Sequence, residues 1–154
     1  MKKLIAGLVL FGASSAYAVP GSWGLTCVAH KGTKKEIKIN AYAADIEGKD
    51  SGFPSEVNIA YPKNVHDDKN DDGTLENLTV VNHLTDGVLA VSYNGDKLGF
   101  NIWALPKTIV LDKGTTELEG HATFHAKGWV SADGEGFENA TFQCSYNYNS
   151  GSAG

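Results

Sequence analysis

An acidic stretch is the segment whose residue types and spacing come closest to a known chemistry. It reads Asp68-Lys69-Asn70-Asp71-Asp72-Gly73-Thr74-Leu75-Glu76. Oxygen-bearing side chains at alternate positions before a glycine are what a hard cation such as calcium requires. The stretch resembles the first half of a D-x-[DN]-x-[DN]-G calcium loop, although the twelfth position holds Thr79 in place of glutamate. Asp68, Asn70, Asp72 and Glu76 are therefore the predicted calcium ligands, and the alternative is a solvated acidic turn.

Two histidines, His121 and His125, suggest transition-metal chemistry by their types but not by their spacing. Residues four apart on a regular strand lie on one face at roughly 13 Å from each other, too far to share one ion. We therefore expect both imidazoles to lie on the polar outer face of a strand.

Two tryptophans, Trp23 and Trp103, are predicted contact residues for a ligand or partner. Along Leu98 to Ala104 the alternation places Leu98, Phe100 and Ile102 on one face. Trp103 then lies on the opposite face, where an exposed tryptophan indicates a contact surface. The alternative is that Trp103 packs under the following Leu105-Pro106 loop.

The two cysteines, Cys27 and Cys144, predict one structural disulfide. Nucleophilic hydrolysis lacks support, because both cysteines are used and no G-x-S-x-G motif occurs. Any two of the 18 acidic residues could still meet as a catalytic carboxylate pair.

The first 18 residues have the features of a cleaved signal peptide. Lys2 and Lys3 precede a short apolar run, and small residues end the segment at Ala16-Tyr17-Ala18. We expect a single β domain over residues 19–148, a flexible tail over residues 149–154, and a periplasmic or extracellular location. An oxidising compartment agrees with a disulfide, and no later segment approaches the roughly 20 apolar residues of a membrane helix, so we expect no membrane insertion.

Charge argues against nucleic-acid partners. The net charge is −5, and all 13 basic residues are lysine. Arginine is the residue favoured for bidentate capture of phosphate, and a negative surface repels nucleic acid.

Period-two alternation of apolar and polar residues indicates strands through most of the chain. Asn94-Gly95 and Asp86-Gly87 are hairpin-turn signals. The expected strands are Trp23 to His30, Glu36 to Ala43, Glu56 to Tyr61, Leu75 to His83, Val88 to Tyr93, Leu98 to Ala104, Thr108 to Asp112, Glu119 to Val130 and Ala140 to Tyr146. Short connections predict an all-β, single-domain antiparallel meander of eight or nine strands, closed or nearly closed into a barrel, with a β-sandwich as the alternative. The disulfide would join its first and last strands and thereby tie the two ends of the sheet together.

These features predict an exported, non-enzymatic binding or protein-interaction module, similar in profile to inhibitors or adhesion proteins, with a protein or glycan partner. The first alternative is a small-ligand carrier with an apolar barrel interior. The second is a carboxylate-based hydrolase. No cofactor other than calcium is expected.

Overall fold

The structure is a computed structural model that describes residues 21–44 and 54–150. The predicted signal peptide, residues 1–18, and residues 151–154 of the predicted tail lie outside the described residues. Two residues assigned to the tail belong to the fold. Asn149 is the last residue of a strand, and the Ser150 N–H donates to the Leu118 carbonyl at 2.7 Å.

Ten antiparallel strands and two short 3₁₀ helices make up the described part of the chain. They are β1 (Ser22–Ala29), β2 (Ile37–Ala43), β3 (Ser55–Ala60), β4 (Val65–Asn70), β5 (Leu78–His83), η1 (Leu84–Asp86), β6 (Val88–Asn94), β7 (Leu98–Ala104), η2 (Pro106–Thr108), β8 (Val110–Leu111), β9 (Glu119–Ala132) and β10 (Gly136–Asn149). Neither described helix is long and apolar enough to cross a membrane.

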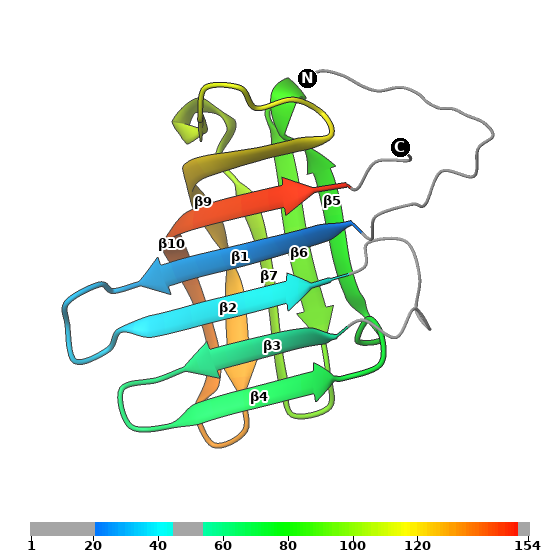
Figure 1. Cartoon of the computed structure of the whole chain (residues 1–154). Coiled ribbons are helices and arrows are strands. Elements are labelled where there is room, and N and C mark those ends of the chain that lie inside the picture. The colour runs from blue at the N-terminus through cyan, green and yellow to red at the C-terminus, as the bar shows by residue number, and fades with distance from the viewer. Residues whose placement is uncertain (1–20, 45–53, 151–154) are drawn as a thin grey trace.

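One sheet contains all of these strands, in the order β4-β3-β2-β1-β10-β9-β7-β6-β5, with β8 added beside β9. The predicted antiparallel meander is confirmed. It curls into a half-barrel in which β1 to β4 cross in front of β5 to β7 (Figure 1). Within the described residues β4 and β5 do not pair with each other, so these two strands form the edges of the sheet.

The disulfide lies in the middle of this sheet. Cys27 on β1 and Cys144 on β10 are direct cross-strand partners with Cα atoms 4.1 Å apart. The predicted bridge between the first and last strands is therefore confirmed. The expectation that it ties together the ends of the sheet is wrong, because β2 to β4 extend the sheet beyond β1.

Alternation of inward and outward side chains forms the core. Along β2 every second residue, from Ile37 to Ala43, is buried. Phe100 and Phe142 face inward and are fully buried, as are Ile39 and Tyr146. Burial of such side chains is the main stabilising contribution in a domain of this size.

The backbone of β7 approaches β9 closely at Gly128. A Cβ atom at this position would lie 1.8 Å from the Asn101 carbonyl oxygen. Only glycine fits there, because a carbon cannot approach a backbone oxygen to that distance. The strand pairing of β7 with β9 therefore depends on Gly128.

The acidic segment contains a strand where the sequence predicts a loop. β4 pairs with β3 from Val65 to Asn70, and its side chains alternate only between exposed and half-buried. The alternation of apolar and polar residues that predicts strands is absent because β4 is an edge strand without an apolar face. Further along, the expected strand from Thr108 to Asp112 shortens to the two residues of β8 after η2.

Candidate functional site

A polar hollow of about 470 Å³ lies where the end of β4, the β4–β5 loop and the β6–β7 turn meet. We call it the seam hollow. Its lining residues are Asp68, Lys69, Leu75, Glu76, Asn77, Tyr93, Asn94, Gly95, Asp96 and Lys97. Two predicted calcium ligands, Asp68 and Glu76, thus line one concavity together with Asp96, which the sequence reasoning missed.

A side-chain hydrogen bond in the seam hollow joins two strands that are distant in the sheet. The Tyr93 hydroxyl on β6 donates to Asp68 Oδ2 on β4 at 2.8 Å. Burial raises the pKa of Tyr93, and the hydrogen bond to Asp68 and the charges of Asp68 and Asp96 raise it further. Tyr93 therefore remains a proton donor. A Cβ at Gly95 would lie 2.7 Å from Asp68 Oδ2, so the glycine leaves room for this contact.

The other two predicted calcium ligands lie elsewhere. Asn70 Oδ1 accepts a hydrogen bond from the Asp72 N–H at 3.0 Å, and neither residue lines the seam hollow. This contact is a local turn of the type that the alternative interpretation predicts. Across residues 21–44 and 54–150, no three His, Cys, Asp or Glu side chains gather closely enough to hold a metal ion. The structure therefore does not bring the four predicted ligands together, because β4 continues through Asn70.

The two predicted contact tryptophans have different environments. Trp23 on β1 is 4% exposed and packs in the core, with its ring centroid 6.0 Å from that of Tyr146. Trp103 on β7 points outward and is 47% exposed. The Leu105-Pro106 loop thus leaves nearly half of Trp103 accessible. Of the pair, only Trp103 presents its side chain to a partner.

Trp103 belongs to an outward surface that spans β5 to β10, which we call the aromatic face. Its apolar members are Val81, Val88, Ala90, Trp103, Trp129 and Phe137. Strand register places Val81 opposite Ala90, and Ala90 opposite Trp103. Trp129 and Phe137 stack on the same face with ring centroids 5.4 Å apart, and Phe137 is 62% exposed.

The sequence reasoning identified Trp103 but missed Phe137 as a member of this surface. The last strand was predicted to start at Ala140, whereas β10 begins at Gly136. Extending the alternation backward from Phe142 places Phe137 on the opposite face. The alternation therefore indicated the outward direction of Phe137, but the predicted strand began after this residue.

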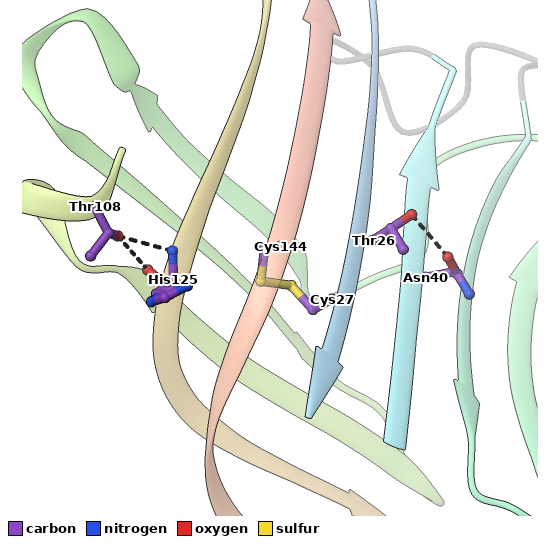
Figure 2. The surroundings of a disulfide bond; sticks show 6 residues. All are labelled: Thr26, Cys27, Asn40, Thr108, His125 and Cys144. Carbon is purple, nitrogen blue, oxygen red and sulfur yellow. Dashed lines mark hydrogen bonds between the residues drawn. A yellow bond between two sulfur atoms is a disulfide. The ribbon is translucent and has the colours of Figure 1, made fainter. Parts of the chain in front are cut away.

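A second groove, of about 520 Å³ and lined by no Asp, Glu, Lys or Arg, lies on the outer face over the disulfide. Thr26, Thr108, Val110, Thr123, Phe124, His125, Gln143, Cys144 and Ser145 line it. Figure 2 shows the disulfide between two polar contacts. On one side the His125 N–H donates to Thr108 Oγ1 at 2.9 Å, and on the other Thr26 Oγ1 donates to Asn40 Oδ1 at 3.0 Å. No sequence motif pointed to this groove.

The two histidines considered as metal ligands have other partners. His121 Nδ1 lies 2.9 Å from Asp112 Oδ2, and the backbone of His125 is held by Thr108. Both residues lie on the outer face of β9, as the alternation predicts.

Glu135, in the β9–β10 turn, ties that turn to the β3–β4 hairpin. Asn64 Nδ2 donates to Glu135 Oε2 at 2.7 Å, and His66 Nε2 lies 3.3 Å from the same oxygen. Hydrogen bonds from Asn64 and then His66 lower the pKa of the Glu135 carboxyl group. Beside them the Tyr61 hydroxyl is buried, and among the described residues it has no hydrogen-bond partner. Burial, followed by the charges of Glu135 and Glu138, raises the pKa of Tyr61.

Comparison with known proteins supports the fold alone. No protein-family model matches the sequence, and neither does a curated protein. A solved structure from Nitrosomonas europaea, provisionally described as AttH, superposes with a TM-score of 0.57 at 12% sequence identity. The match covers 87% of this chain and 51% of that one, so the chain spans about half the length of that protein. At this identity the likeness shows a shared β architecture and carries no function across.

Proposed function

We propose that this protein is an exported, non-enzymatic binding module that contacts a partner protein through the aromatic face. The observation that carries the proposal is the outward, 47% exposed side chain of Trp103 on the regular strand β7. Tryptophan and other aromatic side chains are enriched at protein interfaces, where they bury a large area at a small cost in side-chain entropy.

The charge distribution supports a protein contact at this face. The chain carries a net charge of −5. The cross-strand rows through Val81, Ser92 and Gly99 nevertheless contain one charged side chain, Lys127. Depletion of charge is typical of the centre of a protein interface. A partner can therefore approach this face without meeting the acidic surface of the rest of the chain.

The rigid support of these aromatic side chains also favours the proposed protein contact. Trp103, Trp129 and Phe137 all lie on strands of one sheet. A Cβ atom at Gly99 would lie 3.4 Å from two ring carbons of Trp129, so the indole packs against β7 at this glycine. Side chains held in this way lose little freedom on binding.

Site-specific photo-crosslinking in cells of the native host tests the proposal. A photoreactive phenylalanine analogue replaces Trp103 in one variant and Leu118 in a matched control, since Leu118 is also exposed but lies off the aromatic face. We expect one discrete polypeptide adduct from position 103 and none from position 118. An excess of the unlabelled wild-type protein should suppress the adduct, whereas an excess of a Trp103→Ala, Phe137→Ala protein should not.

Three results would count against the proposal. The first is the same set of adducts from both positions, which indicates random collision. The second is suppression of the adduct by the doubly substituted protein. The third is an organic molecule retained by the native protein in native mass spectrometry, which favours the carrier alternative.

A carboxylate-based hydrolase is the second candidate, and the seam hollow is the observation that favours it. Asp68, Glu76 and Asp96 line this one concavity. Glycoside hydrolysis uses two such carboxyl groups across the scissile bond. We expect Glu76→Gln and Asp96→Asn to abolish any hydrolysis of a panel of chromogenic glycosides. Absence of hydrolysis by the wild-type protein removes this candidate.

A further inference from the structure

β5 forms one edge of the sheet and leaves part of its backbone without a strand partner among the described residues. The Leu78 N–H donates to the Leu75 carbonyl at 3.1 Å and not to β6. N–H groups of alternate residues point to the same side of a strand, so those of Val80 and Asn82 also point away from β6. The carbonyl groups of the same two residues face the same side. This edge therefore offers donors and acceptors to another strand.

The two edges of the sheet carry different side chains. β4 reads Val65-His66-Asp67-Asp68-Lys69-Asn70, with three charged residues in six. β5 reads Leu78-Thr79-Val80-Val81-Asn82-His83, with no Asp, Glu, Lys or Arg. Charged side chains, proline and bulges are the usual protection of an exposed edge against further pairing. β4 has such protection, whereas β5 has none.

We propose that β5 pairs antiparallel with β5 of a second copy, about a two-fold axis that passes at Val81. In this register Val80 of one copy lies opposite Asn82 of the other, and each such pair exchanges two backbone hydrogen bonds. Thr79 lies opposite His83, and no acidic or lysine side chains are opposed. The pattern is self-complementary, as a two-fold interface requires.

The same pairing at β4 is disfavoured by charge. In such a pairing the two-fold axis passes at a residue, because residues opposite each other share one face of the sheet. An axis at Asp67 or at Asp68, the two middle residues of β4, places that aspartate opposite its own copy. Like charges directly opposite each other in a sheet are destabilising. The choice of β5 as the pairing edge thus follows from the side chains of both edges.

Pairing at β5 would extend the aromatic face. The row Val81–Ala90–Trp103 ends at Val81, which is 49% exposed at the edge. In the dimer this row continues through the second copy, and the two Trp103 side chains lie five strand spacings apart, roughly 24 Å. The inference goes beyond the proposed function, because it states an assembly whether or not another protein binds.

Sedimentation velocity of the purified mature protein over a range of concentrations tests the inference. We expect a monomer–dimer equilibrium, because a single strand pair buries a small area and gives a concentration-dependent association. Val81→Lys would place two lysines opposite each other on the axis and should raise the dissociation constant at least tenfold. Val65→Lys is the matched control, since Val65 is 64% exposed on the other edge, and it should leave the equilibrium unchanged.

A cysteine cross-link keeps the test decisive if the lysine variant folds poorly. Residues opposite each other at a pair without backbone hydrogen bonds have Cα atoms about 4.5 Å apart, within reach of a disulfide. We expect Val81→Cys to form a covalent dimer on mild oxidation, and Val65→Cys to form it at least tenfold more slowly. A wild-type protein that stays monomeric at all concentrations, or equal cross-linking from both positions, overturns the inference. None of these readouts requires the partner of the aromatic face, so failure of one proposal is distinguishable from failure of the other.

Discussion

The centre of the sheet and its two edges are held together by different means. At the centre, β9 and β10 pair over 14 residues, and the disulfide joins β10 to β1. At the edges, β4 and β5 are six residues long and each pairs with one strand. Beyond that pairing, single polar contacts such as Asp68 with Tyr93 hold β4 to the opposite part of the sheet. The covalent and most extensive contacts thus lie far from the positions where the sheet is open.

This difference separates contacts on which the whole fold depends from contacts that hold one short strand. Loss of a central contact affects pairs of long strands and the core between them, so the whole fold depends on it. Loss of an edge contact affects one short strand. A protein built in this way can change the side chains of its edge strands and of the seam hollow with little effect on the fold.

The largest effect is expected at Gly128, in the centre. Gly128→Ala introduces a Cβ at 1.8 Å from the Asn101 carbonyl oxygen, so β7 and β9 cannot keep their spacing. We expect a loss of more than about 4 kcal/mol of unfolding free energy, or no folded protein. Urea denaturation followed by tryptophan fluorescence measures this. Gly24→Ala is the control, because its Cβ would meet the flexible Asn147 side chain at 3.0 Å. Equal urea midpoints for Gly128→Ala and Gly24→Ala would show that β9 shifts to accommodate the added methyl group.

The second effect is expected at the disulfide. Replacing Cys27 and Cys144 together by alanine releases a constraint between residues 117 apart in the sequence. In the chain-entropy model this costs up to about 4 to 5 kcal/mol of unfolding free energy. Urea midpoints with and without reductant measure the cost. Reductant should lower the midpoint of the wild-type protein and leave that of the double variant unchanged. A double variant as stable as the oxidised wild type would show that strand pairing alone holds the centre.

A smaller effect is expected at the seam. Tyr93→Phe removes the hydrogen bond to the Asp68 carboxylate while keeping the ring in the core. We expect a loss of about 1 to 2 kcal/mol, between the values for a neutral hydrogen bond and for one to a charged group, because this contact is only partly buried. Tyr42→Phe, at an exposed tyrosine, is the control and should be neutral. Equal stability of both variants would mean that the contact contributes little to holding β4.

The smallest effect is expected at Glu135, which ties the β3–β4 hairpin to the β9–β10 turn. Because its folded-state pKa is lowered, the ionised carboxylate stabilises the fold above the usual glutamate pKa. That contribution disappears as the pH falls through the lowered folded-state value. The difference in melting temperature between wild type and Glu135→Gln should therefore be largest near neutral pH and vanish in acid. A difference that is independent of pH would exclude this ionisation as its source.

The sequence predicted the fold most accurately where strands have one buried face. Alternation identified β2 and β7 almost residue for residue, because one side of each strand enters the core. It missed β4, whose backbone pairs with β3 while neither side of the strand is buried. An edge strand of this kind has no regular alternation of apolar residues. It can be identified only from its pairing with β3 in the structure.

For the candidate sites the same limit applies. Trp103 was predicted to face outward because its own strand carries the signal, and the structure confirms that it is exposed. Its companions on β9 and β10 depend on which strands become neighbours. The seam hollow combines Asp68 and Asp96, which come from opposite sides of the opening, and no local pattern relates them.

The sequence alone therefore determined the secondary-structure type, the inward and outward sides of most strands, and the pairing of Cys27 with Cys144. These properties follow from local alternation and from the presence of two cysteines. The tertiary structure alone decided where the sheet opens, which strands form its edges, and which distant residues share a hollow or a face. Those properties depend on the register and curvature of a complete sheet, because contacts between strands far apart in the sequence have no local signature.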